Sequence, residues 1–563
     1  MRLDAKRHQL DRRVSDLLRE RQIWETRWKD IRDNILPTHG WFDGDIKDGK
    51  RRMNTLANDT PTWSVSVMAA GMQSGLTSPN NQWFRLAPED PELGESNKVL
   101  DYLSKCEEIM QSYMSKSGIY DAFYSAYEEL GAFGIGGFLL LEDTKRGFLP
   151  VPLTIGEYAI GVDAQRAPCE FYRKLQMTPA QMVEQFGKDK VSPETLADFN
   201  NNHNNVRYVH HLIARNDGRI DGNKGLKGKA YLSWYWEDGA DRGEEFLSIG
   251  GYEEFPAIIS RWTVTGPNVY GFGLGEMALG DAAQLQKIEL DKLTALQLSL
   301  RPPLSAPASM RGRISLLPAA QNWYDSTTGD QGIKPILQVT PNLQDTAYEI
   351  ARIEERIKRA FYVNMFLSLL TDPNREQRDR TATEINELHN EKLLMIGPVL
   401  QRLDREMLRP CIDRAFAILE RQGLLPEPPQ EIIGREIRVE YLSPLILAQR
   451  MAAIGAVDRY MGFLSNMSAV DPQILDNIDM DKTAVRYASD LGVPAELMRE
   501  EEAIAQIRQG RAQRQQEMQQ REQAMAEAQV VPGAAKALSE AEPTPNNLLG
   551  QIAGAMAEGG VQQ

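Results

Sequence analysis

The sequence predicts an α+β fold that is mainly helical and carries a helical stalk, and three observations lead to this prediction. Short apolar segments separated by turns fill residues 148–265, as in a mixed, mostly antiparallel sheet region. Apolar residues at helical spacing occupy 276–300 and 345–363, on either side of a Pro-rich insert at 301–344. A further long helical pattern follows at 383–422, although its two prolines should bend it.

Helical patterns also occupy the start of the chain. Over residues 1–36, apolar residues recur at alternating spacings of four and three, with Arg21 as the one polar residue of the stripe, and Pro37 ends the helix. The pattern fits a short coiled coil or a helix packed on its own domain, and its few heptads favour the second. After a loop at 37–60, we expect helices at 62–76, 95–117 and 119–134, and strands at 82–86 and 138–141.

A helix rich in small residues precedes the sheet region, and one further helix is expected within it. The small residues Ala69, Ala70 and Gly71 in the preceding helix should let another backbone approach closely. One helix, at 179–186, is expected to interrupt the strands. The first two-fifths of the chain should therefore form one α+β domain, with strands at 148–153, 158–162, 169–177, 206–214, 231–236 and 257–263.

The two stalk helices have one apolar stripe each. The stripe of the first helix contains Leu285, Ile288 and Leu293, and that of the second contains Ile353 and Ile357. A pair of helices has little core of its own, so its sides must be buried against something else. Copies of the same chain arranged in a ring are the obvious candidate.

The insert and the last part of the chain are less regular. Residues 314–317 and 336–339 could pair as strands, and Arg311, Arg313 and Lys334 give the insert a small positive balance. Such an insert could contact either a partner protein or DNA. One strand is expected at 437–441, helices over 446–502, and a strongly helical Gln/Glu/Arg/Ala-rich stretch at 503–529, before a tail with a composition typical of disorder.

Composition narrows the class of protein. The chain has 563 residues and a formal charge of −15, which argues against a protein that grips DNA tightly by neutralising phosphates. Its 3 cysteines are far apart and form no CxxC motif, so we expect reduced thiols rather than disulfides or a metal site. The charged start does not resemble a signal peptide, and no apolar run reaches the length of about 20 residues that spans a bilayer.

No motif indicates catalysis. The glycine runs at 131–137 and 271–275 lack the full GxGxxG spacing and the Lys-Ser/Thr pair of a phosphate loop, so tight turns between packed elements explain them better. His210 and His211 are adjacent on a predicted strand and should point to opposite faces, where they cannot easily share a metal. We therefore expect no enzyme activity, no cofactor and no metal. An enzyme with an α+β catalytic domain remains an alternative.

A charged break separates the second stalk helix from the long helix. Arg375, Arg378 and Arg380 lie in it, diluted by Glu376 and Asp379, so the net local charge is slight. The segment contains Pro373 and cannot bury itself, so we expect a loop. It is either a solvated loop or one that touches DNA phosphates weakly and reversibly.

Two segments suggest a family. The stretch TWSVSVMAAGMQSGLTSPNNQWFRL runs from Thr62 to Leu86, and NVYGFGLGEMALGDAAQLQKIELDKL runs from Asn268 to Leu293. In these segments the chain resembles the portal, or head-to-tail connecting, proteins of short-tailed bacteriophages. The resemblance implies a portal fold with wing, stem, clip and crown, assembled as a ring of about twelve copies at one capsid vertex.

The resemblance also implies a role for each part of the chain. Residues 1–270 would form the wing, 271–300 the first stem helix, 301–344 the clip, 345–363 the second stem helix and 364–382 the channel loop. Residues 383–445 would form the long wing helix and return strand, 446–502 the crown, and 503–563 a helical barrel extension and disordered tail. Arg311, Arg313 and Lys334 would then lie in the clip, and Arg375, Arg378 and Arg380 would face DNA.

The function implied is a channel through which double-stranded DNA is packaged and ejected, in a virion assembled in the host bacterial cytoplasm. Implied partners are DNA, held weakly, a terminase packaging motor docked on the clip, tail adaptor and nozzle proteins, and major capsid and scaffolding proteins, with no membrane. The acidic residues Glu276, Asp281, Glu289 and Asp291 outnumber Lys287 and Lys292 on the first stem helix, as a low-friction channel requires. A tail adaptor or internal scaffold protein without a DNA-wide bore is the alternative.

Overall fold

The computed structural model describes most of the first 441 residues and short parts of the remainder. The described residues are 1–42, 56–89, 97–202, 205–239, 245–305, 314–315, 334–335, 342–370, 396–432, 434–435, 437–441, 460–464, 467, 483, 504 and 506–520. The chain divides into two compact units, Met1–Leu475 and Asp476–Gln563. In the second unit, residues 506–520 are helical, within the stretch where the composition predicts a helix.

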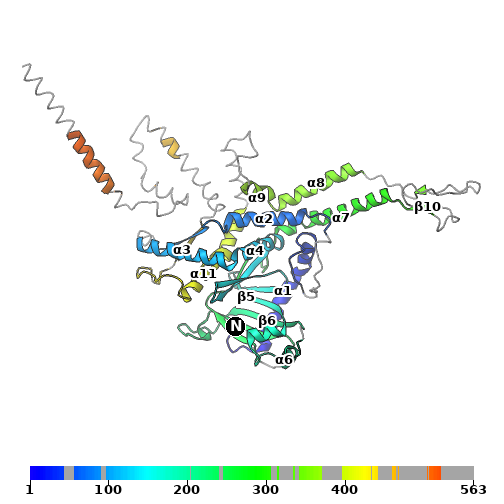
Figure 1. Ribbon diagram of the computed structural model, residues 1–563, viewed down its shortest axis with the longest axis horizontal. Helices are drawn as coiled ribbons and strands as arrows, with labels where there is room; N and C mark the ends of the chain where they lie inside the picture. The colour runs from blue at the N-terminus through cyan, green and yellow to red at the C-terminus, as the bar shows by residue number, and fades with distance from the viewer. Residues whose placement is uncertain are drawn as a thin grey trace, which may run out of the picture. The chain divides into compact units, whose positions relative to one another are not determined.

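Among its described residues the first unit has four antiparallel sheets, two of them simple strand pairs and two larger ones that form its main β part (Figure 1). The larger sheet has the order β4-β5-β6-β7-β8 and the smaller the order β3-β2-β9. Every strand pair among the described residues is antiparallel, which agrees with the alternation seen in the sequence. The strands are β2 (Ile135–Asp143), β3 (Gly147–Pro152), β4 (Tyr158–Val162), β5 (Pro168–Met177), β6 (Arg207–Arg215), β7 (Tyr231–Glu237), β8 (Ser248–Tyr252) and β9 (Ala257–Arg261).

The expectation of a single helix in this region is wrong. Besides α5 (Pro179–Phe186), the structure has α6 (Pro193–Asn200), where the side chain of Ser192 accepts a hydrogen bond from the N–H of Thr195 and Pro193 stands at the first position. Buried Glu237 accepts hydrogen bonds from the hydroxyls of Ser192 (2.8 Å) and Thr195 (2.5 Å). This contact to the end of β7 holds α6 in place although only one of its residues is buried.

The N-terminal helix α1 (Arg7–Asn34) joins two hydrophobic cores. Leu10, Val14 and Leu17 pack on the larger sheet, whereas Trp24 and Trp28 belong to the main core of the unit. Arg21 is buried within the stripe because its guanidinium pairs with Glu25 (2.9 Å) and donates to the carbonyl of Gly156 (2.7 Å). The stripe thus serves packing on the chain's own domain, as its few heptads predict.

Three further helices fill the main core: α2 (Thr60–Leu76), α3 (Asn97–Ser117) and α4 (Ile119–Phe133). Helix α4 is buried over most of its length, which explains why apolar residues surround it rather than form one stripe. A Cβ at Gly71 of α2 would collide with the ring of Phe366 in α9 (Val363–Leu370). The Cβ of Phe366 would be equally close, so the absence of a side chain at Gly71 lets α9 pack directly against α2, as the small residues of this helix predict.

Segments distant in sequence complete this core. Strand β1 (Phe84–Pro88) pairs with β12 (Ile437–Tyr441). The long helical pattern is described from residue 396 and contains a π-helical turn, Asp404–Leu408, before α11 (Arg409–Arg421). The turn widens directly before Pro410, which lacks an N–H to donate, so the irregularity expected from the prolines takes this form. Residues 383–395 of the pattern lie outside the described part of the chain.

A buried carboxyl, Glu129 of α4, fastens the loop that follows β3 to the core. It accepts hydrogen bonds from the Thr154 hydroxyl (2.5 Å) and the Ile155 N–H (3.0 Å). Burial raises its pKa well above the ordinary value of 4.5, although these hydrogen bonds oppose the shift. The folded chain therefore keeps the Glu129 proton at pH values where the unfolded chain has lost it.

Glu129→Gln is expected to change how stability depends on pH. Because the folded state binds the proton more tightly, wild-type stability falls as the pH rises from about 4.5 towards the folded pKa. The glutamine variant lacks this proton, so its melting temperature should gain on that of the wild type as the pH rises from about 4 to 8. Thermal unfolding of both proteins across this range, with exposed Glu108→Gln as a control, measures the effect. Parallel curves for wild type and variant would contradict it.

Candidate functional site

The stalk consists of α7 (Leu274–Leu300) and α8 (Leu343–Ala360), which lie side by side (Figure 1). The chain leaves the core along α7 and returns along α8. Beyond the end of α7, β10 (Leu304–Ser305) pairs antiparallel with β11 (Lys334–Pro335). A long helical hairpin is therefore rooted in the core and carries the insert at its far end.

Burial divides the stalk into a root and a distal half. Leu285, Ile353 and Ile357 are fully buried in the chain's own core, and Ile288 packs against it. Leu293, by contrast, is 53% exposed. Leu290, Leu300 and Tyr348 are further exposed apolar side chains of the distal half, and Met277 is an exposed one at the root. The distal stripe thus remains open to solvent in a single chain, and its packing between copies stays a prediction.

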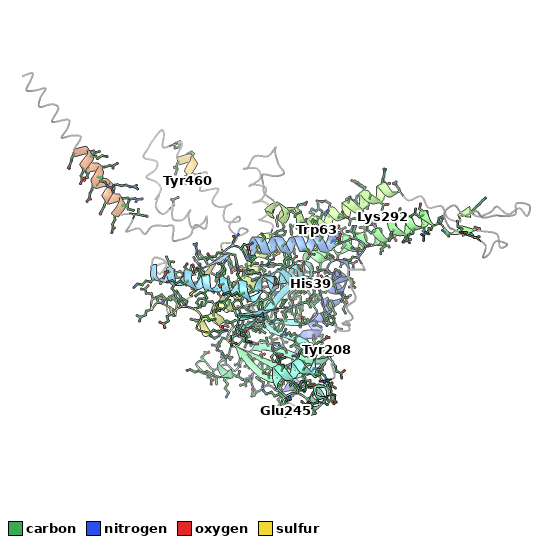
Figure 2. All side chains as sticks on the ribbon, viewed as in Figure 1. His39, Trp63, Tyr208, Glu245, Lys292 and Tyr460 are labelled. Carbon is green, nitrogen blue, oxygen red and sulfur yellow. The ribbon has the colours of Figure 1, made fainter. Side chains whose placement is uncertain are left out.

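Three of the four acidic channel candidates form ion pairs within the chain. Asp281 pairs with Arg356 of α8 (2.7 Å), which joins the two stalk helices. Glu276 lies 3.3 Å from Arg27 of α1, and Glu289 lies 2.7 Å from Lys292 (Figure 2 labels Lys292). Burial raises the pKa of Glu276, and Arg27 partly offsets this. Among the described residues Asp291 has no ion pair, so it is the candidate best placed to present a net negative charge.

Ala57 and Asn58 lie in the segment 37–60, which was expected to be a plain loop, and they join the two stalk helices through hydrogen bonds. Gln286 of α7 accepts hydrogen bonds from the N–H groups of Ala57 (2.7 Å) and Asn58 (3.0 Å), and donates to the Asn58 carbonyl (2.8 Å). The Asn58 amide in turn donates to Glu354 of α8 (3.0 Å). Gln286 is 8% exposed, so these bonds also satisfy its buried amide. No periodicity or motif in the sequence predicts these hydrogen bonds between Asn58 and the two stalk helices.

The two glycine runs meet at the root of the stalk. Gly134 caps the C-terminus of α4 in the left-handed conformation, with φ of 82°. A Cβ at Gly134 would collide with the backbone of Gly271 and Gly273, and one at Gly273 would collide with Gly134. The first run makes a tight turn between α4 and β2, as its sequence predicts, whereas the second is extended backbone, bridged to Thr263 at Phe272, that leads into α7, so the expectation of a tight turn there is wrong. Sequence reasoning missed that each run is the other's neighbour, and that together they set the start of α7.

The remaining predicted site residues fall mostly outside the described part of the chain. This applies to Arg375, Arg378 and Arg380 of the predicted channel loop, and in the insert to Arg311 and Arg313. Lys334 lies in β11 with an exposed side chain.

The strands expected in the insert are only partly covered. Ile314 and Ser315 belong to no strand, so that part of the prediction is wrong, and residues 316–317 and 336–339 are not described. The described pairing lies nearer the stalk, at 304–305 and 334–335.

The two adjacent histidines have separate structural partners on β6. His210 stacks on Trp236 and lies 3.3 Å from Asp238, whereas fully buried His211 stacks on Tyr235 and bonds to the Ser233 hydroxyl. Where the structure describes the chain, no three His, Cys, Asp or Glu side chains gather as metal ligands would. In the same residues, no helix combines the length and the apolar character needed to cross a membrane.

Known proteins resemble this chain over most of its length. The family described as bacteriophage head to tail connecting protein matches residues 7–498. A probable portal protein of Bordetella phage BPP-1 is 39% identical over 512 residues, which cover 90% of this chain and 91% of that protein. The portal protein of Salmonella phage epsilon15 is 32% identical over 556 residues, covering 98% of this chain and 99% of the relative.

Solved structures add only a weak likeness. A chain from the neck of a native gene transfer agent particle aligns with 81% of this chain and 95% of its own, at 12% identity and a TM-score of 0.33, which is too low to carry an argument. The sequence matches are decisive, because they span the sheets, the stalk and the segments on both sides of it. This chain belongs to the family of bacteriophage head-to-tail connecting proteins.

Proposed function

We propose that this chain is a phage portal protein, a component of the virion that forms a ring-shaped channel for double-stranded DNA at one capsid vertex. The relatives named portal protein support this proposal over nearly the whole chain. The structural observation that carries it is the stalk, whose root is buried in the core while its distal half presents exposed Leu290, Leu293 and Leu300. Exposed apolar residues along a helix pair are typical of a protein interface.

In this proposal, about twelve copies close into a ring through heterologous contacts, in which two different flanks of each copy meet. Residues 1–270 form the wing, and 383–445 return to it with the long helix and the strand. Residues 271–300 and 345–363 form the stem, 301–344 the clip, 364–382 the channel loop, and 446–502 the crown, followed by a barrel extension. The core supports treating the stem root as part of the wing, because Leu285 and Ile353 are buried together with residues of α1 and α4.

The proposed role is structural rather than catalytic. The clip, with Arg311, Arg313 and Lys334, would dock the packaging motor first and the tail proteins later, while the wing and crown meet capsid and scaffolding proteins. The channel must let DNA pass, so few fixed phosphate contacts are expected along it. The ion pairs of Glu276, Asp281 and Glu289 support this view, since they leave the stem close to neutral rather than strongly charged.

End-on electron microscopy of the purified full chain tests the proposal. Rings with a central hole wide enough for a duplex, about 20 Å, are the expected result. Compact particles with a solid centre at high protein concentration would overturn it.

Alanine at Arg375, Arg378 and Arg380 together is expected to change DNA retention in packaged particles while the rings still form. The reason is that these arginines would contact phosphates at the narrow part of the channel, and each lost contact weakens a salt-dependent attraction. Released DNA after packaging, measured at two salt concentrations, gives the readout, and ring images give the control. Rings that fall apart would assign the loop a structural role instead.

A further inference from the structure

Two adjoining pockets in the first unit form a feature that the portal function does not explain. The first pocket, of about 330 Å³, lies between the start of β5, β9 and the π-helical turn. The second, of about 650 Å³, continues from it beside the end of β6, the start of β7, the residues that follow β8, and α11. Phe255 and Pro410 line both pockets and therefore stand where they meet. We call this combined feature the arginine groove.

The first pocket carries an excess of positive charge. Four arginines line it, Arg166, Arg261, Arg402 and Arg405, against one carboxylate, Glu406. Arg261 and Glu406 neutralise each other in a buried pair, with Nη2 and Oε1 2.5 Å apart and the arginine side chain 1% exposed. Arg402 lies 3.6 Å from the same carboxylate. The charges of three arginines are therefore left over in a chain whose overall charge is −15.

Two of these arginines are available to a ligand. Arg405 is exposed and forms no ion pair with any described residue, and the side chain of Arg402 is 32% exposed. They stand three positions apart on the π-helical turn and the helical turn before it. Arg166 is held in place because it donates to the carbonyl of Gly266 (2.5 Å). Arginine binds carboxylates in a bidentate geometry, so this pocket favours a planar anion.

The floor of the groove is apolar, which narrows the class of ligand. Ile259 and Val264 line the first pocket, and Phe255 and Pro410 continue the apolar surface into the second. A pocket of this volume accommodates a few side chains, whereas a DNA duplex about 20 Å wide is too broad to enter it. An acidic side chain flanked by apolar residues would match both the positive charge of the first pocket and the apolar floor of the groove.

The second pocket adds arginines to the groove, although three carboxyl groups also line it. Arg414 in its wall is 1% exposed, and its Nη2 has no hydrogen-bond partner among the described residues, although its other nitrogens bind the Leu140 carbonyl and Glu254. Exposed Arg215 forms no ion pair there either, within the described residues. Two acidic neighbours are already engaged, Glu254 by Arg414 and Arg421 and Glu253 by Lys229. Burial raises the pKa of Asp413, the third, to about 6.

We propose that the arginine groove docks an extended, acidic and partly apolar peptide segment of a partner protein. A carboxylate of the segment binds Arg402 and Arg405 in the first pocket. An apolar side chain then covers Phe255 and Pro410, and the peptide continues towards Arg215. The proposal goes beyond the portal function and does not depend on ring formation.

Fluorescence anisotropy with the purified full chain tests the proposal. The probe is a fluorescein-labelled peptide of alternating glutamate and leucine with blocked ends, and its match has glutamine in place of glutamate. The glutamate peptide should bind at least roughly tenfold more tightly than the glutamine peptide, as the loss of one charge-assisted contact predicts. Equal binding of the two peptides would overturn the proposal.

Variants then locate the binding. Arg402→Ala with Arg405→Ala should weaken the glutamate peptide by roughly tenfold or more, whereas Arg12→Ala with Arg19→Ala, which removes the same charge from an exposed face of α1, should leave it unchanged. Arg405→Glu provides a second test at an exposed residue, and melting curves confirm that each variant folds. Unchanged affinity in the groove variants would overturn the proposal. So would displacement of the peptide by inorganic phosphate or a DNA duplex at lower concentration than by unlabelled peptide, which would assign a phosphate site.

Discussion

Gly134→Ala is expected to remove most of the folded protein, because two separate penalties meet at this residue. The φ of 82° is left-handed, and a residue with a Cβ adopts it at a cost of about 1–2 kcal/mol. The added Cβ would also collide with backbone atoms of Gly271 and Gly273, which cannot rotate away as a side chain can. Together we expect a loss of about 3–5 kcal/mol, a large part of the stability of an ordinary domain. The shift of the urea unfolding midpoint measures it.

Gly222→Ala separates the two penalties. Gly222 has nearly the same φ, 81°, but nothing lies within 4 Å of the Cβ that alanine would add. It should therefore show the conformational penalty alone, about 1–2 kcal/mol. A similar loss in both variants would mean that the two glycine runs tolerate a side chain between them, and that their contact does not fix the start of α7.

Where a local signal decides the structure, the sequence predicted it closely. Helix α5 has the predicted bounds, Pro179–Phe186, because Thr178 and Gln181 form a capping box, proline occupies the first position and Gly187 follows the end. Strand β12, Ile437–Tyr441, is also found where it was predicted. In both cases residues a few positions apart carry all the information that is needed.

Contacts between distant segments could not be predicted in this way. Strand β8, Ser248–Tyr252, contains two glycines and was missed, since its pairing with β7 rather than its own composition makes it a strand. The hydrogen bonds between Asn58 and Gln286 join residues more than 200 positions apart. The excess of positive charge in the arginine groove also arises only because the fold brings β9 and the π-helical turn together. The ion pair between Arg261 of β9 and Glu406 of the turn marks this contact.

In the candidate site, too, the sequence predicts some features of the stalk and not others. The apolar stripe of α7 was correctly assigned to the stalk, yet a stripe does not reveal which of its residues are buried in the chain's own core. Leu285 is fully buried, whereas Leu293 is 53% exposed. This difference depends on how far along α7 its contacts with α1, α4 and Asn58 extend. Sequence periodicity alone therefore assigns one role to residues that have two.

Aspartate at each of these two leucines is expected to separate folding from assembly. Leu285→Asp places a carboxylate in the apolar core and removes a buried side chain, so we expect a loss of at least about 4 kcal/mol and little soluble protein. Leu293→Asp puts the same charge on an exposed position, where the melting temperature of the single chain should change little. If the distal stripe joins copies of the portal ring, this variant should nevertheless fail to form rings, since each copy would bury an unpaired charge.

Circular dichroism melting and electron microscopy of the same preparations separate the two effects, and the result bears on the stalk as a whole. Gln297→Asp is the matched control, because it adds the same charge at an exposed polar residue of α7. Rings formed normally by Leu293→Asp would exclude this part of the stripe from the interface between copies. A folded Leu285→Asp chain that only fails to assemble would instead move the interface to the root. The expected pattern, a folding defect at the root and an assembly defect beyond it, follows from a stalk that is anchored in its own subunit and completed by its neighbours.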